Sequence, residues 1–425
     1  MDFRTCIDNE RIQNNVIVCE DALSPHLELT KKIIELEPSP ALLSGVGAIP
    51  VAANLFCSRN SMARHLDLPQ DTFLPSLARK LKSDPIHIHN SGSIFGEREW
   101  PAIDLNDLPI LFHYPGDGGK YITSAVWIVN DAQSGRNLSY HRMMVIDGRR
   151  GAVRVVENRG MHQAIHHAGG RASVAICLGA PPAVLLAAAL SPAASVDEME
   201  LAGKLDAITL ADCKTIDVQV PANCEIVIEG IFTGESGNEG PFVDITGTWD
   251  YIRNQPLLEV TRIASRQNPI YHALVPGRSE HKTLMGMPKE LDIFNKVNEV
   301  CACLDVNMTA GGCSWLHAVV KIRKEHGDDG LNSLRAAFEA HPSLKYCVVV
   351  DEDIDIHATE QVEWAVATRF QADKDLLVMS DMPSSSLDPS AYHIPGKKSR
   401  GAKLGLDATI KKSGAERAMF ERVRL

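Results

Sequence analysis

Several features that assign proteins to specialised classes are scarce in this chain. Its ten cysteines are scattered, the closest two being Cys301 and Cys303, and no C-x2-C pair occurs. That spacing excludes the usual patterns of a disulfide framework or a zinc site. The formal net charge of -11 argues against nucleic-acid binding as the main role. Because Met1 is followed at once by Asp2 and Arg4, we expect no secretory leader, and the scattered thiols favour a reducing, cytoplasmic location.

Long apolar runs are scarce as well, and residues 172–195 are the one candidate for a membrane span. Three prolines interrupt this run at Pro181, Pro182 and Pro192. We therefore expect that the protein does not associate with a membrane. The run predicts a buried strand over residues 173–178 and then a buried helix that starts at the proline pair, where a missing N–H costs little.

What the chain does contain is the composition of a large globular protein. With 425 residues, 44% of them hydrophobic and 23% charged, it is long enough for two or three domains. We predict a mixed N-terminal α/β region over residues 1–105, a β-rich domain over 106–288, and an α/β domain over 289–425. The β-rich domain is expected to form a sheet or a barrel.

The predicted elements follow from local composition. Runs rich in Val, Ile and aromatic residues predict strands over 121–129, 140–146, 153–156 and 225–232. In the C-terminal domain, helices alternate with short apolar strands, which indicates a largely parallel α/β sheet. The expected helices there are 291–303, 331–340 and 360–370, and the expected strands are 317–322, 346–350 and 376–379.

The most informative run is Glu239-Gly240-Pro241-Phe242-Val243-Asp244-Ile245-Thr246-Gly247, which holds two carboxylates on one segment bounded by Gly and Pro. Moving a proton to or from carbon needs an acid whose pKa has been shifted by burial or by a charged neighbour. Two carboxylates at fixed spacing on a stiff turn are one way to obtain such an acid. The alternative is a solvated acidic loop.

Two further motifs carry polar side chains with more than one interpretation. The run Asn137-Leu138-Ser139-Tyr140-His141-Arg142 begins a predicted strand, whose alternation would put Tyr140 and Arg142 on one face. An Arg there could bind a carboxylate or phosphate through two parallel hydrogen bonds, but a salt bridge between strands explains the residue equally well. The pair Asp197-Glu198 is explained by an acidic cap at the start of a helix.

Three other runs leave alternatives open. Residues 116–120 are glycine-rich but lack the spacing of a phosphate loop, so they predict a β-turn before a strand. Residues 351–357 hold four carboxylates and an imidazole, which fits a hard-metal site or, as we favour, structural packing at a strand end. Residues 277–282 could hold a phosphate through Arg278, His281 and Lys282, or form a surface loop.

Four ordered motifs together resemble those of the UbiD-type decarboxylases, which use prenylated flavin mononucleotide (prenylated FMN). The similarity covers roughly residues 108–415, and the Glu-Gly-Pro-Phe segment is its most specific part. The motifs are Asn137-x4-Arg142, Asp197-Glu198 followed by Leu201-Ala202-Gly203, Glu239-Gly240-Pro241-Phe242-x-Asp244-x-Thr246-Gly247, and Lys403-Leu404-Gly405-Leu406-Asp407-Ala408-Thr409.

The resemblance implies a catalytic trio of Arg142, Glu239 and Asp244. Asp244 would protonate the carbon from which carbon dioxide has left, and Arg142 would bind the substrate carboxylate and relay charge with Glu239. A lysine of the family that reaches the cofactor phosphate matches Lys403. The cofactor-binding residues that the resemblance implies are Asn137, Tyr140, His141, Arg142, Arg159, Gly160, Glu198 and Lys403.

The resemblance also implies a divalent metal, usually manganese, between the cofactor phosphate and the protein, with K+ as a further candidate ion. Asn137 and Glu198 match two of the metal ligands. Where the family commonly has a histidine ligand, this chain has Asn158, with His162 nearby. Either Asn158 supplies an oxygen ligand, or His162 takes that place, or the metal is bound more weakly. Oxygen ligands suit manganese or magnesium better than zinc.

The family's fold is a β-rich, split-barrel-like flavin-binding domain joined by a helix to an α/β oligomerisation domain. The implied class is therefore α+β. The implied reaction is reversible, non-oxidative decarboxylation of an α,β-unsaturated or aromatic carboxylic acid. A flavin prenyltransferase would supply the cofactor, and a homo-oligomer, either a dimer or a hexamer, is expected.

The substrate remains open at this point. The compact members of the family include archaeal anhydromevalonate phosphate decarboxylases, for which Arg278, His281 and Lys282 could hold the substrate phosphate. Aromatic and heteroaromatic acids are the rival substrates. A third alternative is a flavin-binding homologue without catalytic activity.

Overall fold

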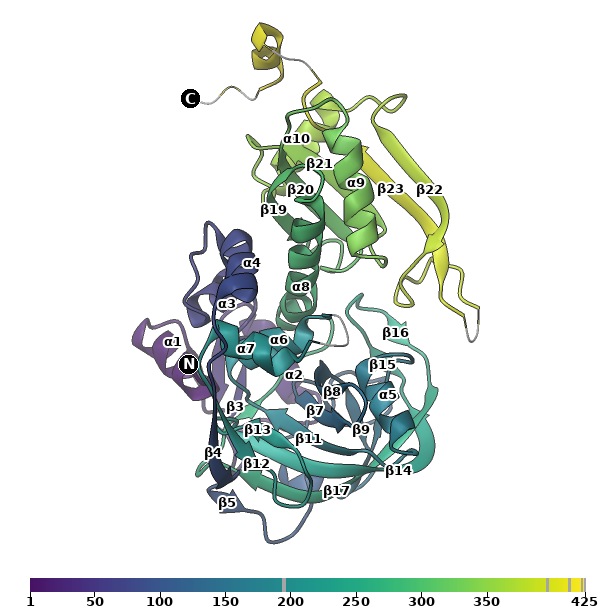
Figure 1. Ribbon diagram of the computed structural model, residues 1–425. Coiled ribbons are helices and arrows are strands. Elements are labelled where there is room, and N and C mark those ends of the chain that lie inside the picture. The colour runs from purple at the N-terminus through teal and green to yellow at the C-terminus, as the bar shows by residue number, and fades with distance from the viewer. Residues whose placement is uncertain (193–195, 395–396, 412–413, 422, 424–425) are drawn as a thin grey trace. The chain divides into compact units, whose positions relative to one another are not determined.

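The computed structural model describes residues 1–192, 196–394, 397–411, 414–421 and 423, and it divides into two compact units (Figure 1). Unit 1 consists of Met1–Gln70 and Lys80–Leu284. Unit 2 consists of Asp71–Arg79 and Met285–Leu425. Helix α8 (Ser279–Val297) starts in unit 1 and ends in unit 2.

The centre of unit 1 is a nine-stranded sheet in the order β6-β9-β10-β17-β14-β11-β7-β8, with β5 paired to β17. All of these pairings are antiparallel. Register shifts in the long β14–β17 pair bend these two strands. They curve along the lower side of unit 1 in Figure 1. The strands are β5 (Arg98–Glu99), β6 (Tyr121–Ile122), β7 (Val126–Asp131), β8 (Gly135–Tyr140), β9 (Met143–Val145), β10 (Arg150–Val153), β11 (Ser173–Leu178), β14 (Ile226–Glu239) and β17 (Arg253–Ser265).

The core of unit 1 lies on one face of this sheet. Alternate residues Ile226 and Ile228 of β14 are buried in the same apolar cluster as Trp127 of β7 and Ile176 of β11. This two-residue period is the signal that predicted strands in these runs. The predicted strands over 121–129 and 140–146 are each split into two shorter ones.

The apolar run 172–195 forms β11 and helix α6 (Pro182–Ala189), which confirms the predicted strand and the helix start at the proline pair. All residues of α6 from Pro182 to Ala188 are buried. Residues 193–195 lie outside the described part of the chain. Within that part, no helix combines the length and the apolar character needed to cross a membrane.

Smaller elements surround the large sheet of unit 1. The remaining sheets have the orders β1-β2-β3-β18, β13-β12-β4 and β15-β16. Their strands are β1 (Ile17–Cys19), β2 (Ala41–Leu43), β3 (Val51–Ala53), β4 (Ile88–Ile94), β12 (Ile208–Asp212), β13 (Gln219–Pro221), β15 (Phe242–Val243), β16 (Trp249–Asp250) and β18 (Tyr271–His272). The helices of unit 1 are α1 (Phe3–Ile12), α2 (Glu28–Leu36), α3 (Arg59–His65), η1 (Leu105–Asp107), α5 (Gly160–His167), α6 and α7 (Glu198–Leu205). Helix α4 (Phe73–Ser83) belongs to unit 2 up to Arg79.

Unit 2 holds a five-stranded mixed sheet in the order β19-β20-β21-β23-β22. Two of its pairings are parallel, β20–β21 and β21–β23, and two are antiparallel, β19–β20 and β22–β23. The α+β class is confirmed, but the prediction of a largely parallel sheet is wrong, because both edge strands run antiparallel to their neighbours. The elements are β19 (Ala302–Met308), β20 (His317–Arg323), α9 (Asp329–Ala340), β21 (Tyr346–Asp351), α10 (Thr359–Arg369), β22 (Leu376–Pro383), β23 (Arg400–Asp407) and η2 (Gly414–Phe420).

The helix predicted over 291–303 is placed too far along the chain, since α8 starts at Ser279 and ends at Val297. The side chain of Asn298 donates to the carbonyl of Phe294 at 2.8 Å and accepts the N–H of Cys303 at 3.1 Å. These side-chain bonds add to the backbone bonds at the end of α8 and connect it to the first residues of β19.

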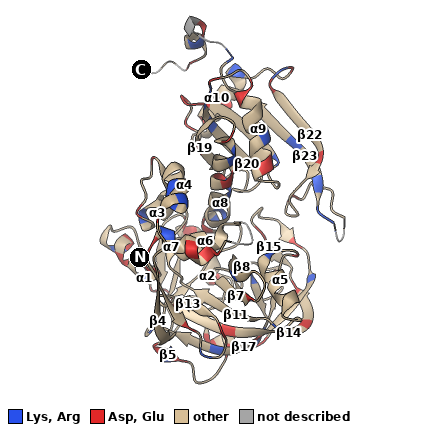
Figure 2. Ribbon diagram, in the orientation of Figure 1, with Lys and Arg blue, Asp and Glu red and all other residues tan. Residues whose placement is uncertain are grey.

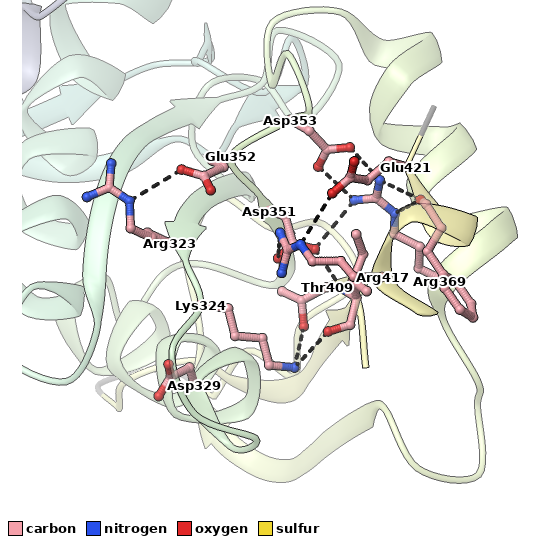
Figure 3. Close-up of polar contacts among 12 residues, drawn as sticks. Arg323, Lys324, Asp329, Asp351, Glu352, Asp353, Arg369, Thr409, Arg417 and Glu421 are labelled. Carbon is pink, nitrogen blue, oxygen red and sulfur yellow. Dashed lines mark hydrogen bonds and ion pairs between the residues drawn. The ribbon is translucent and has the colours of Figure 1, made fainter. Parts of the chain in front are cut away.

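The acidic run 351–357 forms ion pairs in unit 2 (Figure 3). Arg369 donates from Nη2 to Asp353 Oδ2 at 2.6 Å and from Nη1 to Asp351 Oδ2 at 3.4 Å. Arg369 also donates to the carbonyl of Phe420 at 2.9 Å, which ties η2 to α10. Among the described residues, no cluster of three or more His, Cys, Asp or Glu could hold a metal ion. These contacts agree with the structural interpretation of this run.

Charged residues are mixed by sign along both units (Figure 2). Many of them form close pairs between strands or loops, such as Arg262 with Glu229 at 2.6 Å and Arg4 with Glu225 at 2.7 Å. Both carboxylates of these pairs are fully buried, so each pair needs the hydrogen bonds that surround it.

Candidate active site

The predicted trio meets at the guanidinium of Arg142, between β8 and β9. Its Nε and Nη2 lie 2.8 Å and 3.1 Å from the two oxygens of Glu239, which is a two-point fork. Its Nη1 donates to Asp244 Oδ2 at 2.8 Å. Burial opposes the charge of Arg142, but the surrounding carboxylates raise its pKa above the ordinary value.

A third carboxylate, Asp250, also binds this guanidinium. Arg142 Nη2 donates to Asp250 Oδ2 at 2.8 Å, and Arg253 Nη2 donates to Asp250 Oδ1 at 2.5 Å. Burial opposes ionisation of Asp250, but its bonds with Arg253 and Arg142 lower the pKa of this carboxyl. Asp250 is therefore a permanent anion between two cations.

Glu239, Asp244 and Asp250 with Arg142 form the active-site cluster, and Asp244 is its most accessible carboxylate. Its side chain is 18% exposed, against 0% for Glu239 and 5% for Asp250. Of the five N–H groups of Arg142, one on Nη1 has no partner among the described residues. The free donor and the accessible acid therefore lie on the same side of the guanidinium.

A hairpin positions these carboxylates. Glu239 ends β14, and the chain then forms β15 and β16, with Asp244 in the turn and Asp250 on the returning strand. Gly240 has φ +98°, and a Cβ there would lie 3.0 Å from the carbonyl of Tyr251, so this position requires glycine. The Asp244 carbonyl accepts the N–H of Gly247 at 2.8 Å, which closes the turn.

Two aromatic rings fix the cluster from inside the unit. The Phe242 ring lies 4.3 Å from Cζ of Arg142, a cation–π contact. Tyr121 packs on Phe242 with ring centroids 4.6 Å apart and donates its hydroxyl to Glu239 Oε1 at 3.1 Å. Burial, followed by the charge of Glu239, raises the pKa of Tyr121, so its hydroxyl stays a donor.

The glycine-rich run 116–120 forms the predicted turn before β6, and it contacts the hairpin. The N–H of Gly118 donates to the carbonyl of Pro241 at 2.8 Å. A Cβ on Gly118 would lie 2.2 Å from the carbonyl oxygen of Gly240. Asp117 accepts the N–H of Tyr114 at 2.9 Å, and burial raises the pKa of Asp117 to about 6.

The predicted metal ligands Asn137 and Glu198 are in contact. Asn137 Nδ2 donates to Glu198 Oε1 at 3.2 Å, and the N–H of Leu138 donates to Glu198 Oε2 at 3.0 Å. Burial raises the pKa of Glu198. A Cβ on Gly160 would lie 2.6 Å from Cγ of Asn137, so the start of α5 packs directly on that amide. An amide oxygen and a carboxylate are ligands that hard cations prefer.

Asn158 lies on the exposed turn before α5, with φ +62°. It is two residues from Gly160, so its Cα lies within about 7.6 Å of the glycine that touches Asn137. His162 is half-buried on α5 itself. Among the described residues, neither side chain bonds to Asn137 or Glu198, so the choice between Asn158 and His162 as ligand stays a prediction.

The other predicted cofactor residues of unit 1 are held by neighbouring elements. Tyr140 donates its hydroxyl to the carbonyl of Leu185 in α6 at 3.1 Å. His141 lies 2.9 Å from both Ser139 Oγ and the carbonyl of Arg154, and burial lowers its pKa to about 4. Arg159 is exposed and immediately precedes α5, whose N-terminus is a suitable place for a phosphate.

Lys403 lies in β23 of unit 2. Its ammonium donates to the carbonyls of Pro342 at 2.9 Å and Leu344 at 2.5 Å. Burial lowers the pKa of Lys403 to about 8. Its assignment to the cofactor phosphate stays a prediction.

The run 277–282 begins α8. Arg278 and the N–H of Ser279 both bind the carboxylate of Glu37, at 2.6 Å and 2.7 Å. His281 Nδ1 accepts the N–H of Gly277 at 3.0 Å, and burial lowers the pKa of His281 while the nearby charge of Asp244 opposes this. Arg278 thus already binds an anion, and His281 borders the active-site cluster.

Comparison with known proteins identifies the family. Three domains described for 3-octaprenyl-4-hydroxybenzoate carboxy-lyase match this chain: the N-terminal domain at residues 7–81, the Rift-related domain at 89–279 and the C-terminal domain at 282–408. The chain belongs to the UbiD family. Members of this family are carboxy-lyases, that is, decarboxylases.

Relatives within the UbiD family match nearly the whole chain. Anhydromevalonate phosphate decarboxylase of Methanothermobacter thermautotrophicus is 39% identical over 97% of this chain and 98% of its own length. The enzyme of that name from Methanocaldococcus jannaschii is 38% identical over 97% of each. Among solved structures, the UbiD-class enzyme HmfF from Pelotomaculum thermopropionicum in complex with FMN has a TM-score of 0.93 and 32% identity, covering 100% of this chain and 97% of that one.

Sequence reasoning missed three residues that the UbiD fold brings to Arg142. Tyr121 and Asp250 lie far from Arg142 in the chain, and only pairing of strands brings them together. Phe242 belonged to the quoted motif, but no role followed from its position. The return strand with Trp249 and Asp250 after a turn was the one local signal for the third carboxylate.

Proposed function

We propose that this protein is a decarboxylase that uses prenylated FMN and acts on anhydromevalonate phosphate. The observation that carries the proposal is the guanidinium of Arg142, which binds Glu239 and Asp244 at once and keeps one N–H without a partner in the described part of the chain. Relatives that match nearly the full length support the substrate, since several carry that activity in their names.

The reaction requires one bond to break and one to form. The bond between the carboxylate and its neighbouring carbon breaks, carbon dioxide leaves, and the electron pair stays on that carbon. Asp244 then gives its proton to the carbon, forming a C–H bond, and recovers a proton from solvent through its exposed edge. Arg142 holds the departing carboxylate by its free N–H.

The electron pair needs a sink that amino-acid side chains do not supply. Prenylated FMN provides it when bound, and two UbiD-class structures similar to this chain contain FMN or prenylated FMN. We propose that Asn137, Tyr140, His141, Arg159, Gly160 and Glu198 line its site in unit 1, with Lys403 as the predicted phosphate ligand. The polar groups of β8 and the N-terminus of α5 suit an anionic cofactor.

We propose a manganese ion held by Asn137, Glu198 and Asn158. This set contributes oxygen ligands only, which suits a hard divalent cation, and K+ remains a further candidate. The contact of Glu198 with Asn137 and the packing of Gly160 on that amide support it.

A phosphate on the substrate needs a cation near Asp244. Lys282 follows His281, and their charges interact, while no hydrogen bond or ion pair to the Lys282 ammonium occurs among the described residues. Lys282 is thus the better candidate for phosphate binding, since Arg278 already binds Glu37.

We further propose a cytoplasmic homo-oligomer, a dimer or hexamer, that receives its cofactor from a flavin prenyltransferase. An exposed apolar strip on the β22–β23 edge of unit 2 supports self-association, with Val378 57% and Leu404 40% exposed. These two residues are direct partners in the sheet, so they lie on the same face.

The test is release of carbon dioxide by the full-length protein, purified after co-expression with a flavin prenyltransferase. We expect anhydromevalonate phosphate to be decarboxylated, and benzoate- and furan-type acids to react at least about 100-fold more slowly, because the Lys282 ammonium would lack its partner. Equal or faster turnover of an aromatic acid would reject the substrate. A colourless, metal-free protein that neither releases carbon dioxide nor exchanges deuterium into product would support the non-catalytic alternative.

The proton donor has its own test. Asp244→Asn keeps the shape and the bond to Arg142, so cofactor absorbance should be retained while turnover falls by about 100-fold to 10,000-fold. Asp147→Asn is the matched control, because Asp147 pairs with Arg150 at 2.8 Å on the surface. Wild-type rates in Asp244→Asn would remove Asp244 from the mechanism.

A further inference from the structure

The pair formed by Asp250 and Arg253 supports Arg142 from the side opposite Asp244. Asp250 accepts from Arg253 on one oxygen at 2.5 Å and from Arg142 on the other at 2.8 Å. The backbone N–H of Tyr251 also donates to Asp250 Oδ1, at 3.0 Å. Asp250 thus accepts three hydrogen bonds, and both of its oxygens are engaged.

These contacts restrict the orientation of the Arg142 guanidinium. Glu239 binds the Nε edge, Asp250 binds the outer N–H of Nη2, and only Nη1 faces Asp244. Rotation of the guanidinium would break the bonds to both Glu239 and Asp250. The free N–H is therefore held in one direction by two carboxylates, although only Glu239 belongs to the predicted trio.

The charges of the cluster do not cancel. Glu239, Asp244 and Asp250 contribute three negative charges when ionised, against two positive charges from Arg142 and Arg253. Glu239 has a forked guanidinium and the Tyr121 hydroxyl, and Asp250 has two guanidinium groups. Asp244 has a single guanidinium contact, and its other oxygen accepts the N–H of Ile245 at 2.7 Å, so it has the fewest cationic contacts of the three.

Other titratable groups face the cluster as well. The charge of Arg154 acts on Asp250, but Arg154 also pairs with Glu157 at 3.9 Å. Asp117 adds a negative charge near Arg142 once it ionises. His281 is neutral when its Nδ1 accepts the N–H of Gly277, and Lys282 acts on His281.

We propose that Asp250, held by Arg253, is a positioning residue that fixes the guanidinium of Arg142, and that the opposite charges of Asp250 and Arg253 act in opposite senses on proton release by Asp244. This inference rests on the proposed function, in which Asp244 gives that proton to carbon. Asp250 itself touches neither substrate nor reacting atoms.

Two substitutions should shift the pH at which Asp244 loses its proton in opposite directions. Asp250→Asn removes one negative charge, so Asp244 should hold its proton only at lower pH. Arg253→Met removes one positive charge, so Asp244 should hold its proton to higher pH. Each shift should be on the order of 1 in pH, the effect of one charge within about 6 Å. A loss of structure alone would not give opposite signs.

The first readout is the pH dependence of kcat in the holoenzyme, on the limb where activity falls as pH rises. Its midpoint should move down in Asp250→Asn and up in Arg253→Met, while Arg253→Lys, which keeps the charge, stays near wild type. The matched controls are Asp147→Asn and Arg150→Met, because this exposed pair has the same spacing in sequence. Both controls should leave the midpoint unchanged.

The second readout does not need turnover. Holoprotein labelled with 13C at the aspartate carboxyls is titrated by NMR, and the Asp244 signal is identified by its loss in Asp244→Asn. The titration midpoint of this signal should fall in Asp250→Asn and rise in Arg253→Met. If wild-type protein releases no carbon dioxide, the proposed function fails, and this titration still decides the positioning role. Shifts of the same sign in both variants, or shifts no larger than those of the controls, would overturn it.

Discussion

At the scale of single residues, burial sets the chemistry of several side chains around Arg142. Asp117 is the clearest case, because its side chain is fully buried and its pKa is raised to about 6. The ordinary value for Asp is 3.8. The folded state therefore favours the protonated form, and the stability contributed by Asp117 is complete below about pH 4 and is lost as pH rises through 6.

Asp117→Asn should remove this pH dependence. The amide keeps an acceptor for the N–H of Tyr114 but carries no charge. We expect the variant to be stabilised relative to wild type at pH 8 by about 2 to 3 kcal/mol, and by little at pH 4.5. Apparent Tm measured across this range checks the result. Asp8→Asn, at an exposed position, is the control and should show no trend with pH.

Arg142, Glu239 and Asp244 were singled out because each stands in a recognisable local motif, whereas their surroundings depend on tertiary pairing. Glu239 and Asp244 share one short segment, and the motif around Arg142 was recognisable. Asp250 and Tyr121 reach the same guanidinium and carboxylate only through strand pairing, which no single-sequence pattern specifies. The contact of the third carboxylate with Arg142 therefore could not be predicted, although the return strand that carries it left a local signal.

At the scale of elements, turns hold the site together. The turn at residues 116–119 packs on the hairpin that carries Asp244, through the bond from Gly118 to Pro241 at 2.8 Å. This run was predicted correctly as a turn, but its contact with the hairpin was not. A β-turn motif describes local backbone geometry and contains no information about its tertiary partner.

Gly118→Ala should separate this turn from the hairpin. The new Cβ would meet the backbone carbonyl oxygen of Gly240 at 2.2 Å, which cannot be relieved by a side-chain rotation. We expect a loss of about 1 to 3 kcal/mol in stability and of about 10-fold to 100-fold in kcat. Thermal unfolding and carbon dioxide release measure the two effects. Gly327→Ala, where a Cβ meets nothing within 4 Å, is the control.

Gly160→Ala tests the packing of α5 on the proposed metal ligand. Its Cβ would lie 2.6 Å from Cγ of Asn137, so the amide must move away from Glu198. We expect manganese bound per chain to fall at least about 10-fold. Elemental analysis of purified protein gives the content. Gly311→Ala is the control, because a Cβ there meets nothing within 4 Å, and it should bind metal as wild type does.

At the scale of the whole molecule, sequence patterns predicted the class but not every strand direction. Helices α9 and α10 and strands β20, β21 and β22 lie close to their predicted ranges. The sheet of unit 2 is mixed because the consecutive strands β19 and β20, and likewise β22 and β23, pair antiparallel. Between α8 and β19 the chain leaves the helix at Asn298. The side-chain bonds of Asn298 to Phe294 and Cys303 depend on the folded structure and cannot be read from composition.

Self-association should depend on the apolar strip of the edge strand β22 and its neighbour β23. Val378→Glu with Leu404→Glu places two charges opposite each other on an exposed face. We expect the oligomer to dissociate to monomers, as measured by light scattering after size exclusion, because like charges and desolvation disfavour the interface. Ile12→Glu in unit 1, at a residue 80% exposed, is the control and should leave the oligomer intact.

If Arg142 binds the substrate carboxylate as proposed, the single N–H that has no partner among the described residues has a consequence for how carbon dioxide leaves. A guanidinium that offered two parallel donors would clamp both carboxylate oxygens and hold the group in one plane. One donor anchors one oxygen and leaves the torsion about the carbon–carbon bond free. The carboxylate can therefore twist until the breaking bond lies parallel to the substrate's π orbitals, the alignment in which its electrons delocalise as carbon dioxide departs. The crowding of carboxylates on Arg142 thus gives the substrate rotational freedom where a stronger clamp would remove it.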